Sequence, residues 1–360
     1  MASRKTVISI RRSLVGWYHK QKRDLPWRKT RDPYFIWVSE IMLQQTQVKK
    51  VIPYYLKWIA AFPTVSKLAL SPESRVLKLW EGLGYYSRAR NLRRAASIVE
   101  SDYGGRVPDS YDEIMKLPGI GHYSAGAVLS IAFKKKVAAL DGNAIRVLSR
   151  LFKLAENGAS GKSLNRLRHI AEELLPDDCP GDFNQALMEL GAEVCSPKKP
   201  ACPVCPVRPW CMGEKLGQQE NYPPVKKRPP SKKIEVSAAV ILRNGKVYIQ
   251  QRPVNGLMGG LWEFPGGKKE KNESSENCLL REIREELGVA VVIRKKLMTI
   301  KHSYTQFRVT LHVYYCRLPQ GHIRATSCDQ WKWVRPEDLG GFPFPAANVK
   351  IVDRLIKSDL

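Results

Sequence analysis

The chain has 360 residues, which is too long for one ordinary hydrophobic core and sufficient for two domains. Its formal net charge of +26 concentrates polyanions, of which nucleic acid is the commonest inside cells. The sequence contains no run of about 18 apolar residues, which excludes a membrane span. Its first residues also lack the apolar core of a secretory signal. We therefore expect a cytoplasmic protein that binds nucleic acid.

Residues 5 to about 190 predict one helix after another. Apolar residues recur there at spacings of three and four, and prolines stand where helices would begin or end. Basic residues alternate with aromatic ones at 23–31 and 85–94, a pattern that suits phosphate contacts beside stacking or wedging side chains. We expect an all-α domain over residues 1–217.

The second half of the chain has a different period. Residues 218–233 are polar, basic and rich in proline, which indicates a linker. Strand-like alternation then surrounds Asn244-Gly245, a strong hairpin signal, and a helix is predicted at about 275–287. We expect residues 234–360 to form an α+β domain.

A glycine-rich turn over residues 117–126 is the first candidate binding element. Gly119 and Gly121 permit left-handed turns, and His122 follows at the expected start of a helix. A helix N-terminus presents unpaired backbone N–H groups to which a phosphate can bind. An ordinary helix–helix turn would also explain the glycines, but the basic charge of the chain favours a hairpin that binds DNA.

Asp141 lies about twenty residues farther along, just before an apolar-periodic segment. Its default role is to cap that helix at its N-terminus. A carboxylate at this point could also face a positive centre that develops in a ligand. Both roles remain open on the sequence alone.

The chain has eight cysteines, and four of them fall within seventeen residues. In an intracellular protein such a group argues for metal binding before disulfides. Four thiolates suit either tetrahedral zinc or an iron–sulfur cluster. The four are Cys195, Cys202, Cys205 and Cys211, separated by six, two and five residues.

Together, the glycine hairpin, the downstream aspartate and the four cysteines resemble the helix-hairpin-helix DNA glycosylases, specifically endonuclease III and the MutY family, over residues 5–215. The resemblance implies that the cysteines bind a [4Fe–4S] cluster, chiefly for structure and DNA placement. It also identifies the branch. Endonuclease III-type lyases have a lysine two residues after the second glycine, where this chain has Tyr123, and a phenol cannot form a Schiff base. The chain therefore resembles the monofunctional MutY adenine glycosylases.

Glu40 lies in a largely apolar helical segment, so burial could keep its carboxyl protonated near neutral pH. By itself the sequence favours an ordinary polar stripe, because Glu40 shares a helical face with Gln44 and Gln47. The resemblance reverses this preference, since the segment matches the catalytic glutamate of the MutY family. It implies that Glu40 protonates N7 of a flipped adenine.

The resemblance implies further roles around the N-glycosidic bond. Asp141 would stabilise the oxocarbenium-like sugar, as an ion pair or through a transient covalent bond, with Tyr123 and Asn143 as supporting residues. Leu25 and Arg28 match the adenine pocket. Gln45 and Tyr85 match residues that wedge into the duplex, although burial in a helix packing face is a rival explanation for Tyr85.

The C-terminal domain resembles the Nudix fold that MutY proteins use to read the lesion. Here the Nudix sequence is complete, and Glu282, Glu285 and Glu286 fall on one helix face that could offer three carboxylates to Mg²⁺. Two interpretations stay open: an inherited but idle site, or a second activity that hydrolyses an oxidised nucleoside triphosphate.

The lesion-reading loop departs from the family pattern. MutY proteins commonly present Phe-Ser-His, whereas this chain has Tyr304-Thr305-Gln306. Tyr304 can replace the phenylalanine and Thr305 keeps a hydroxyl, but Gln306 changes the hydrogen-bonding groups. Discrimination between 8-oxoguanine and guanine is thus less firmly implied than adenine excision.

The sequence therefore predicts a monomeric base excision repair enzyme of the bacterial nucleoid, in the cytoplasm. It would bind double-stranded DNA and remove adenine opposite 8-oxoguanine or guanine. Three alternatives differ from this prediction: another base specificity on the same scaffold, a Nudix hydrolase tethered to DNA, and a protein that binds damage without catalysis.

Overall fold

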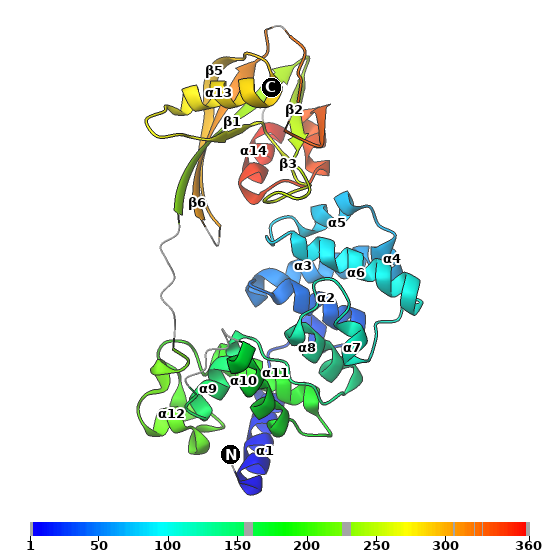
Figure 1. The fold of residues 1–360 in the computed structure, drawn as a ribbon, viewed down its shortest axis with the longest axis vertical. Helices are drawn as coiled ribbons and strands as arrows, with labels where there is room; N and C mark the ends of the chain where they lie inside the picture. The colour runs from blue at the N-terminus through cyan, green and yellow to red at the C-terminus, as the bar shows by residue number, and fades with distance from the viewer. Residues whose placement is uncertain are drawn as a thin grey trace. The chain divides into compact units, whose positions relative to one another are not determined.

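The computed structural model describes residues 3–154, 161–224, 232–304, 307–319, 321–325 and 327–357. The chain divides into two compact units (Figure 1). One comprises Met1–Leu70 with Asn91–Lys227, and the other comprises Ser71–Arg90 with Arg228–Leu360. Within the described ranges, no helix combines the length and the apolar character that crossing a bilayer requires.

The first unit is helical, and several of its helices begin where a side chain caps the first turn. The side chains of Ser3, Asp32 and Thr64 accept hydrogen bonds from backbone N–H groups of the helices that follow them. The α-helices are α1 (Arg4–Gln21), α2 (Pro33–Leu43), α3 (Val48–Ala61), α4 (Val65–Ala69), α6 (Ser87–Tyr103), α7 (Tyr111–Ile114), α8 (His122–Phe133), α9 (Gly142–Leu151), α10 (Gly161–Leu174), α11 (Pro180–Glu193) and α12 (Met212–Lys215). Short 3₁₀ turns occur at η1 (Pro26–Arg28), η2 (Cys202–Val204), η3 (Arg208–Trp210) and η4 (Gln219–Asn221).

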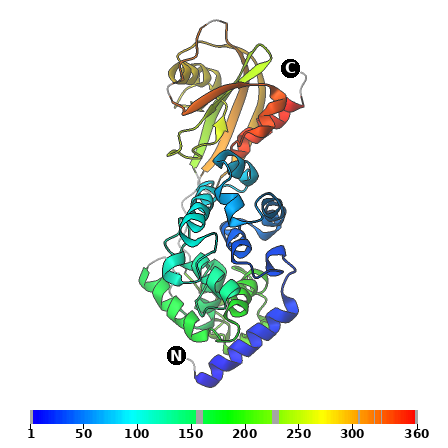
Figure 2. The same cartoon turned by 90° about the vertical axis from the view of Figure 1, so that its right-hand side faces the viewer.

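One core of this unit lies between the apolar faces of α1, α9, α10 and α11. Tyr18, Leu148 and Phe183 are among its fully buried members. Figure 2 shows α1, coloured dark blue, along one end of the unit, and it packs against α11. The core therefore holds α9 and α11, which both contribute side chains to the site described below, on one rigid support.

A second contact, between α2 and α8, brings two further site residues together. Helix α2 is buried from Ile36 to Met42, as its nearly unbroken apolar sequence requires. Helix α8 reaches its neighbours closely through Gly126, where a Cβ atom would lie 2.2 Å from the carbonyl oxygen of Ala138. Only glycine fits at this approach.

The second unit is built on a mixed sheet with strand order β3-β2-β1-β6-β5. Strands β1 and β6 run parallel with Ala238 opposite Val313, and the other pairings are antiparallel. Off this path, β4 pairs with β1 and β7 pairs with β2. The strands are β1 (Lys232–Arg243), β2 (Lys246–Gln251), β3 (Trp262–Glu263), β4 (Gly266–Lys268), β5 (Val292–Ser303), β6 (Phe307–Arg317) and β7 (Gln330–Val334).

A helix covers each face of this sheet (Figure 1). Helix α13 (Ser275–Leu287) packs Leu279 and Ile283 against one face, and α14 (Ala346–Ile356) packs Ile351 against the other. The 3₁₀ turn η5 (Pro336–Gly341) precedes α14. The helix and the hairpin at Asn244-Gly245 that the sequence predicts are both present.

The second unit also includes a segment from the middle of the chain. Residues Ser71–Arg90 carry α5 (Glu73–Trp80), a loop and the first turn of α6, and they form one compact unit with the C-terminal residues. Nothing in the hydrophobic pattern of the sequence indicated this association, because it depends on contacts between positions more than 250 residues apart.

Candidate active site

A cavity of about 760 Å³ opens in the helical unit between η1, α2, α8, α9 and α11. It brings together most of the residues that the sequence marks as catalytic or adenine-binding. Those that line it are Leu25, Arg28, Glu40, Gln45, Gly121, Tyr123, Asp141 and Asn143.

Glu40 lies in the last turn of α2 with only 5% of its surface exposed. The Tyr123 hydroxyl donates a hydrogen bond to Glu40 Oε2. Burial raises the pKa of Glu40 to about 7, the Tyr123 bond opposes that rise, and the nearby charge of Asp141 adds to it. The carboxyl is therefore poised to hold and release a proton near neutral pH.

Asp141 caps α9 and lines the cavity at the same time. Its Oδ1 accepts from the Ala144 backbone N–H at 2.7 Å, and its Oδ2 accepts from Asn143 Nδ2 at 2.8 Å. Burial raises the pKa of Asp141, while these two hydrogen bonds lower it by favouring the charged form. The helix-capping role of Asp141 is thus confirmed, and the same carboxylate faces the cavity.

Arg146 ties this aspartate to the cysteine-bearing loop. Its guanidinium donates to Asn143 Oδ1 at 2.8 Å, to the Gly191 carbonyl at 2.7 Å and to the Cys195 carbonyl at 2.8 Å. Since Asn143 in turn donates to Asp141, a continuous chain of hydrogen bonds runs from the loop to the cavity. It fixes the amide of Asn143 so that its donor end points at the carboxylate.

Arg28 is held by a residue that the sequence did not identify. The carboxylate of Glu189, which is 1% exposed, accepts from Arg28 Nη2 at 2.8 Å and from Arg23 Nη2 at 2.7 Å. Burial acts to raise the pKa of Glu189, but the bonds from Arg23 and Arg28 outweigh burial and hold it at about 2. Glu189 is therefore ionised and fixes the guanidinium of Arg28 at the cavity wall.

Helix α11 contributes a cavity wall that sequence reasoning missed. Gln185, Met188 and Glu189 line the cavity, and Met188 also lies 3.4 Å from the Tyr123 hydroxyl. The available signal was a charged residue inside the apolar run Ala186-Leu187-Met188-Glu189-Leu190, since a lone buried carboxylate requires a partner. The sequence alone could not name that partner.

The glycine hairpin has a backbone that requires glycine at one position and leads into a helix without a side-chain cap. Gly119 has φ +82°, and a Cβ atom there would lie 2.7 Å from Asn91 Cβ, so another residue would be strained and crowded. Gly121 precedes α8, and no side chain caps the first turn of that helix. Its backbone N–H groups are available to a phosphate. The exposed ring of His122 stacks on Tyr111 at the same place.

The two expected wedge residues, Gln45 and Tyr85, share an unusual backbone. Gln45 has φ +56° and Tyr85 has φ +47°, both in the left-handed region that non-glycine residues rarely occupy. Both are exposed, Tyr85 to 37%. The rival explanation for Tyr85, burial in a helix packing face, is wrong because the residue lies in the loop before α6. Gln45 belongs to the helical unit and Tyr85 to the other.

The four clustered cysteines line one small cavity beside Arg150. Burial, followed by the charges of the other three thiols, raises the pKa of Cys205 to about 12. Across the described ranges, no three His, Cys, Asp or Glu side chains converge on a point where one metal ion could bind. The four cysteine thiols therefore line the same cavity, but among the described residues they do not form a site for one metal ion. The four are Cys195, Cys202, Cys205 and Cys211.

The expected lesion-reading loop joins β5 to β6. Tyr304 is half-buried, with its ring 4.4 Å from that of His302 and 4.9 Å from that of Phe307. Its backbone N–H donates to the Phe307 carbonyl at 2.8 Å, and Ser303 beside it is exposed. Thr305 and Gln306 lie outside the described residues.

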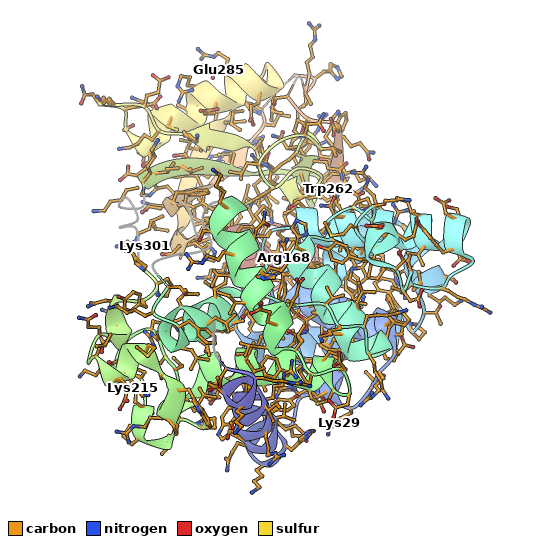
Figure 3. All side chains as sticks on the ribbon, turned by 60° about the horizontal axis from the view of Figure 1, so that its bottom comes forward. Lys29, Arg168, Lys215, Trp262, Glu285 and Lys301 are labelled. Atoms are coloured by element: carbon orange, nitrogen blue, oxygen red, sulfur yellow. The ribbon has the colours of Figure 1, made fainter. Side chains whose placement is uncertain are left out.

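The glutamates of the Nudix sequence lie on α13 and are engaged with protein groups. Arg281 pairs with Glu282 and Glu285, each at 3.1 Å, and Figure 3 shows Glu285 on the outer side of the helix. Glu286 accepts from the Gly266 N–H at 3.1 Å and from Gln250 Nε2 at 3.0 Å. Burial raises the pKa of Glu286 to about 7. Within the described ranges, these carboxylates also do not converge on a point where a metal ion could bind.

Comparison with known protein families agrees with this two-part architecture. Residues 38–176 match the HhH-GPD superfamily of base excision DNA repair proteins, and residues 237–354 match the NUDIX domain. The chain is 33% identical to adenine DNA glycosylase of Rattus norvegicus, over 96% of this chain and 77% of the relative. The chain belongs to the adenine DNA glycosylase family.

Further relatives in this family come from distant organisms. The Homo sapiens adenine DNA glycosylase is 35% identical over 92% of this chain and 71% of its own length. The corresponding protein of Buchnera aphidicola from Acyrthosiphon pisum is 34% identical over 85% of this chain and 86% of its own. The family thus spans bacteria and animals, and its members act on N-glycosyl bonds in base excision repair.

Solved structures support the fold of the helical half. A thermostable thymine-DNA glycosylase superposes with a TM-score of 0.55 at 33% identity, over 59% of this chain and 98% of that protein. A DNA complex of endonuclease III, trapped as a covalent intermediate, superposes with a TM-score of 0.52 at 22% identity, over 60% of this chain and 99% of that protein. The second match concerns the fold alone. The prediction of a helical glycosylase domain followed by a NUDIX-like domain is confirmed.

Proposed function

We propose that this adenine DNA glycosylase is monofunctional and removes adenine paired with 8-oxoguanine, and less readily with guanine, acting as a monomer on duplex DNA. One observation carries the proposal: Glu40 and Asp141 line the same cavity, and Tyr123 stands where a lyase would need an amine. Among the described residues that line the cavity, none is a lysine. A Schiff base with the sugar therefore has no nucleophile there.

Glu40 is the general acid in this proposal. With a pKa of about 7 its carboxyl is about half protonated at neutral pH, so a substantial fraction of the protein can deliver a proton to N7 of an adenine flipped into the cavity. The proton makes the base a neutral leaving group when the N-glycosidic bond breaks. The Tyr123 hydroxyl, bonded to Oε2, restrains the carboxyl in one orientation during this transfer.

Asp141 stabilises the positive charge that develops on the sugar as the base departs. Its two hydrogen bonds, from Asn143 and from the Ala144 backbone, favour the ionised form that this role requires. Arg28 also lines the cavity and is fixed by Glu189, so its guanidinium can orient the adenine. The two carboxyl groups at the cavity thus have different hydrogen-bond partners: Glu40 accepts from a phenol, and Asp141 accepts from an amide and a backbone N–H.

The four gathered cysteines are proposed to bind a [4Fe–4S] cluster. They line one cavity, and their separations of six, two and five residues are those that the resemblance to endonuclease III and the MutY family links to such a cluster. Such a cluster would supply structure to the loop that Arg146 connects to Asn143. Its presence is tested by the iron content and visible absorption of the purified protein.

The NUDIX-like domain is proposed to read the base opposite adenine. Its support is the aromatic tip between β5 and β6, where Tyr304 packs on His302 and Phe307 beside the exposed Ser303. An aromatic ring and adjacent hydroxyls suit contact with a modified base. Nucleotide hydrolysis is the alternative function, and it would require Mg²⁺ to bind Glu282 and Glu285, which here pair with Arg281.

Single-turnover base release on labelled duplexes tests the function. The panel contains 8-oxoguanine·adenine, guanine·adenine, thymine glycol·adenine, guanine·thymine and undamaged DNA, and each product is read with and without alkali. We expect adenine loss that becomes a strand break only after alkali, fastest opposite 8-oxoguanine, and abolished in Glu40→Gln and Asp141→Asn.

Three results would overturn parts of this proposal. A break without alkali would show lyase activity. Thymine release from the guanine·thymine duplex, without adenine release, would move the specificity toward that of the thymine-DNA glycosylase. Turnover of 8-oxo-dGTP with Mg²⁺, measured beside the duplex panel, would show that the NUDIX-like domain is itself an enzyme.

A further inference from the structure

The loop Glu81–Tyr86 between α5 and α6 holds Tyr85 in a left-handed backbone conformation that tyrosine does not favour by itself. Three of its residues have positive φ: Gly82 at +100°, Gly84 at +75° and Tyr85 at +47°. Glycine adopts this region freely, but tyrosine does so at a cost of about 1 kcal/mol or more. A strained, exposed aromatic residue persists only where its surroundings fix it.

Part of that support comes from within the segment. Trp80 Nε1 donates to the Gly84 carbonyl at 3.0 Å, and Arg88 donates to the carbonyls of Leu83 and Gly84 at 3.3 and 3.2 Å. The Arg88 guanidinium also lies over two rings, 5.2 Å from the centre of Trp80 and 5.6 Å from that of Tyr85. Arg88 therefore supports the inner face of Tyr85 and leaves its outer face exposed.

The other part comes from the C-terminal domain, in which Phe344 bonds both ends of the loop. The Phe344 backbone N–H donates to Glu81 Oε1 at 2.7 Å, and the Phe344 carbonyl accepts from the Tyr86 hydroxyl at 3.2 Å. That hydroxyl also accepts from the Gly82 N–H at 3.3 Å. The two residues at the ends of the loop are thus bonded to the two polar groups of a single residue.

These contacts are built into the interior of the unit rather than lying on its surface. The exposed fraction is 1% for Phe344 and 6% for Tyr86, and the Phe344 ring stacks on Phe264. Lys78 reinforces the arrangement by bonding Glu81 Oε2 at 2.7 Å and the Phe342 carbonyl at 3.0 Å. Breaking a buried, charge-assisted bond of this kind leaves the remaining group without its partner.

A second contact fixes the far end of the segment. Gly260, with φ +69°, lies so close to Arg90 that a Cβ atom would be 2.7 Å from Arg90 Nη2. Arg90 is itself paired with Glu73 at 3.0 Å. The C-terminal domain therefore touches the segment both before and after Tyr85.

We propose that Glu81 and Tyr86 are positioning residues through which the NUDIX-like domain fixes Tyr85 in its exposed, left-handed conformation. The domain then contributes to lesion recognition by two routes: its own β5–β6 tip, and the wedge residue that it holds in place. This inference rests on the proposed function and on the role of Tyr85, implied by the family resemblance, as a residue that wedges into the duplex.

A double-mutant cycle tests the inference. Glu81→Ala, Tyr86→Phe and Tyr85→Ala are compared singly, and each of the first two is combined with the third, in the full-length protein. Affinity is measured for a duplex with 8-oxoguanine opposite a non-hydrolysable 2′-fluoro-adenosine. Stacking of the wedge is read separately from the fluorescence of 2-aminopurine placed beside the 8-oxoguanine.

We expect each positioning variant to weaken binding about tenfold and to change the 2-aminopurine signal in the same direction as Tyr85→Ala. Combined with Tyr85→Ala, neither should weaken binding further, because the residue that they position is gone. Losses that simply multiply in the double variants would overturn the inference. So would binding that stays at the wild-type level in both single variants.

A control separates positioning from general loss of stability. Ile351→Val removes one buried methylene from α14 in the same unit, at a residue with no part in the loop contacts. It should lower Tm while leaving affinity and fluorescence unchanged, and equal losses of affinity in this control would count against the inference. Failure of the proposed function gives a different result, in which the wild-type protein releases no adenine from any duplex.

Discussion

The hydroxyl of Tyr123 on α8 donates a hydrogen bond to Oε2 of Glu40 on α2. Burial, followed by the charges of Glu40 and Asp141, raises the pKa of Tyr123 well above its ordinary value, so the phenol remains a neutral donor. The residue that stands in place of the lyase nucleophile is thus bonded to the carboxyl that we propose as the general acid. In the proposed mechanism, tyrosine at position 123 removes the lyase reaction and supports proton donation by Glu40.

The first prediction concerns the pH dependence of base release. Since Glu40 must be protonated to act and its pKa is about 7, the single-turnover rate should be flat below that pH. Above it the rate should fall about tenfold per pH unit. Rates at saturating enzyme, from about pH 5.5 to about pH 9, measure this profile. A rate that stays level through pH 8 would show that the group does not donate the proton.

The second prediction separates the effect of Tyr123 from that of burial. The hydrogen bond from Tyr123 lowers the pKa of Glu40, so Tyr123→Phe should raise it and move the fall in rate to higher pH. The plateau rate should also drop about ten- to hundredfold, because the carboxyl is no longer held in one orientation. An inflection that stays in place, whatever the plateau, would contradict this account of the bond.

The third prediction concerns stability rather than rate. The pKa of Glu40 is about 7 in the folded protein and 4.5 ordinarily, so its contribution to stability is complete below pH 4.5 and is lost as pH rises through 7. The difference corresponds to about 3 kcal/mol. Glu40→Gln should therefore abolish activity yet raise Tm at about pH 8, with little change at about pH 5. Equal Tm differences at the two pH values would argue against a desolvated carboxyl.

Glu40 and Glu189 show how far the sequence could predict this site. The apolar surroundings of Glu40 are local in sequence, so its burial could be foreseen. Glu189 pairs with Arg23 and Arg28, more than 160 residues away, and no local pattern encodes such a pairing. The helix cap that Asp141 provides could be predicted from its position in the sequence. The place of Asp141 in the cavity depends on how α9 packs against α11, which the sequence does not show locally.

The same distinction applies to the fold. The change of period near residue 234 predicted the sheet, because alternation is a local property of strands. The joining of residues 71–90 to the C-terminal unit was not predictable in this way. It depends on Glu81 and Tyr86 reaching Phe344, and single polar residues of this kind leave no periodic signal.

The fourth prediction concerns the link between the cysteine loop and Asp141. Arg146 bonds Asn143, Gly191 and Cys195 at once, which a lysine cannot do because it lacks the planar fork. Arg146→Lys should slow base release about ten- to hundredfold by freeing the amide of Asn143.

Arg150→Lys is its matched control. Arg150 bonds the carbonyls of Ser196 and Pro197 at 2.7 and 2.8 Å, and its hydrogen bonds in the described part of the chain go to the cysteine loop and Tyr222 rather than to Asn143 or Asp141. This variant should lower the iron content or Tm more than the rate measured per cluster-bearing molecule. If the two variants slowed base release equally, the specific path through Asn143 would be ruled out.

The last prediction concerns Glu189. Its carboxylate pairs with both Arg23 and Arg28, and replacing it with alanine would remove the buried counter-charge of Arg28 and leave Arg23 only its exposed partner Glu193. We expect Glu189→Ala to destabilise the helical unit by about 3–5 kcal/mol and to displace Arg28 from the adenine pocket, with loss of base release. Glu193→Ala removes the exposed partner of the same Arg23, 2.9 Å away, and should cost less than about 1 kcal/mol.

The stability that Glu189 contributes through Arg23 and Arg28 depends on pH with the opposite sign to that of Glu40. The pKa of Glu189 falls from 4.5 to about 2 on folding, so its contribution is present above pH 4.5 and is lost as pH falls through 2. The wild-type protein and Glu193→Ala should therefore lose stability in acid, while Glu189→Gln should lose about 3 kcal/mol less over the same range. Chemical denaturation at several pH values measures the free energy of unfolding. Equal losses of stability in all three proteins would show that the pairs of Glu189 with Arg23 and Arg28 do not cause the sensitivity to acid.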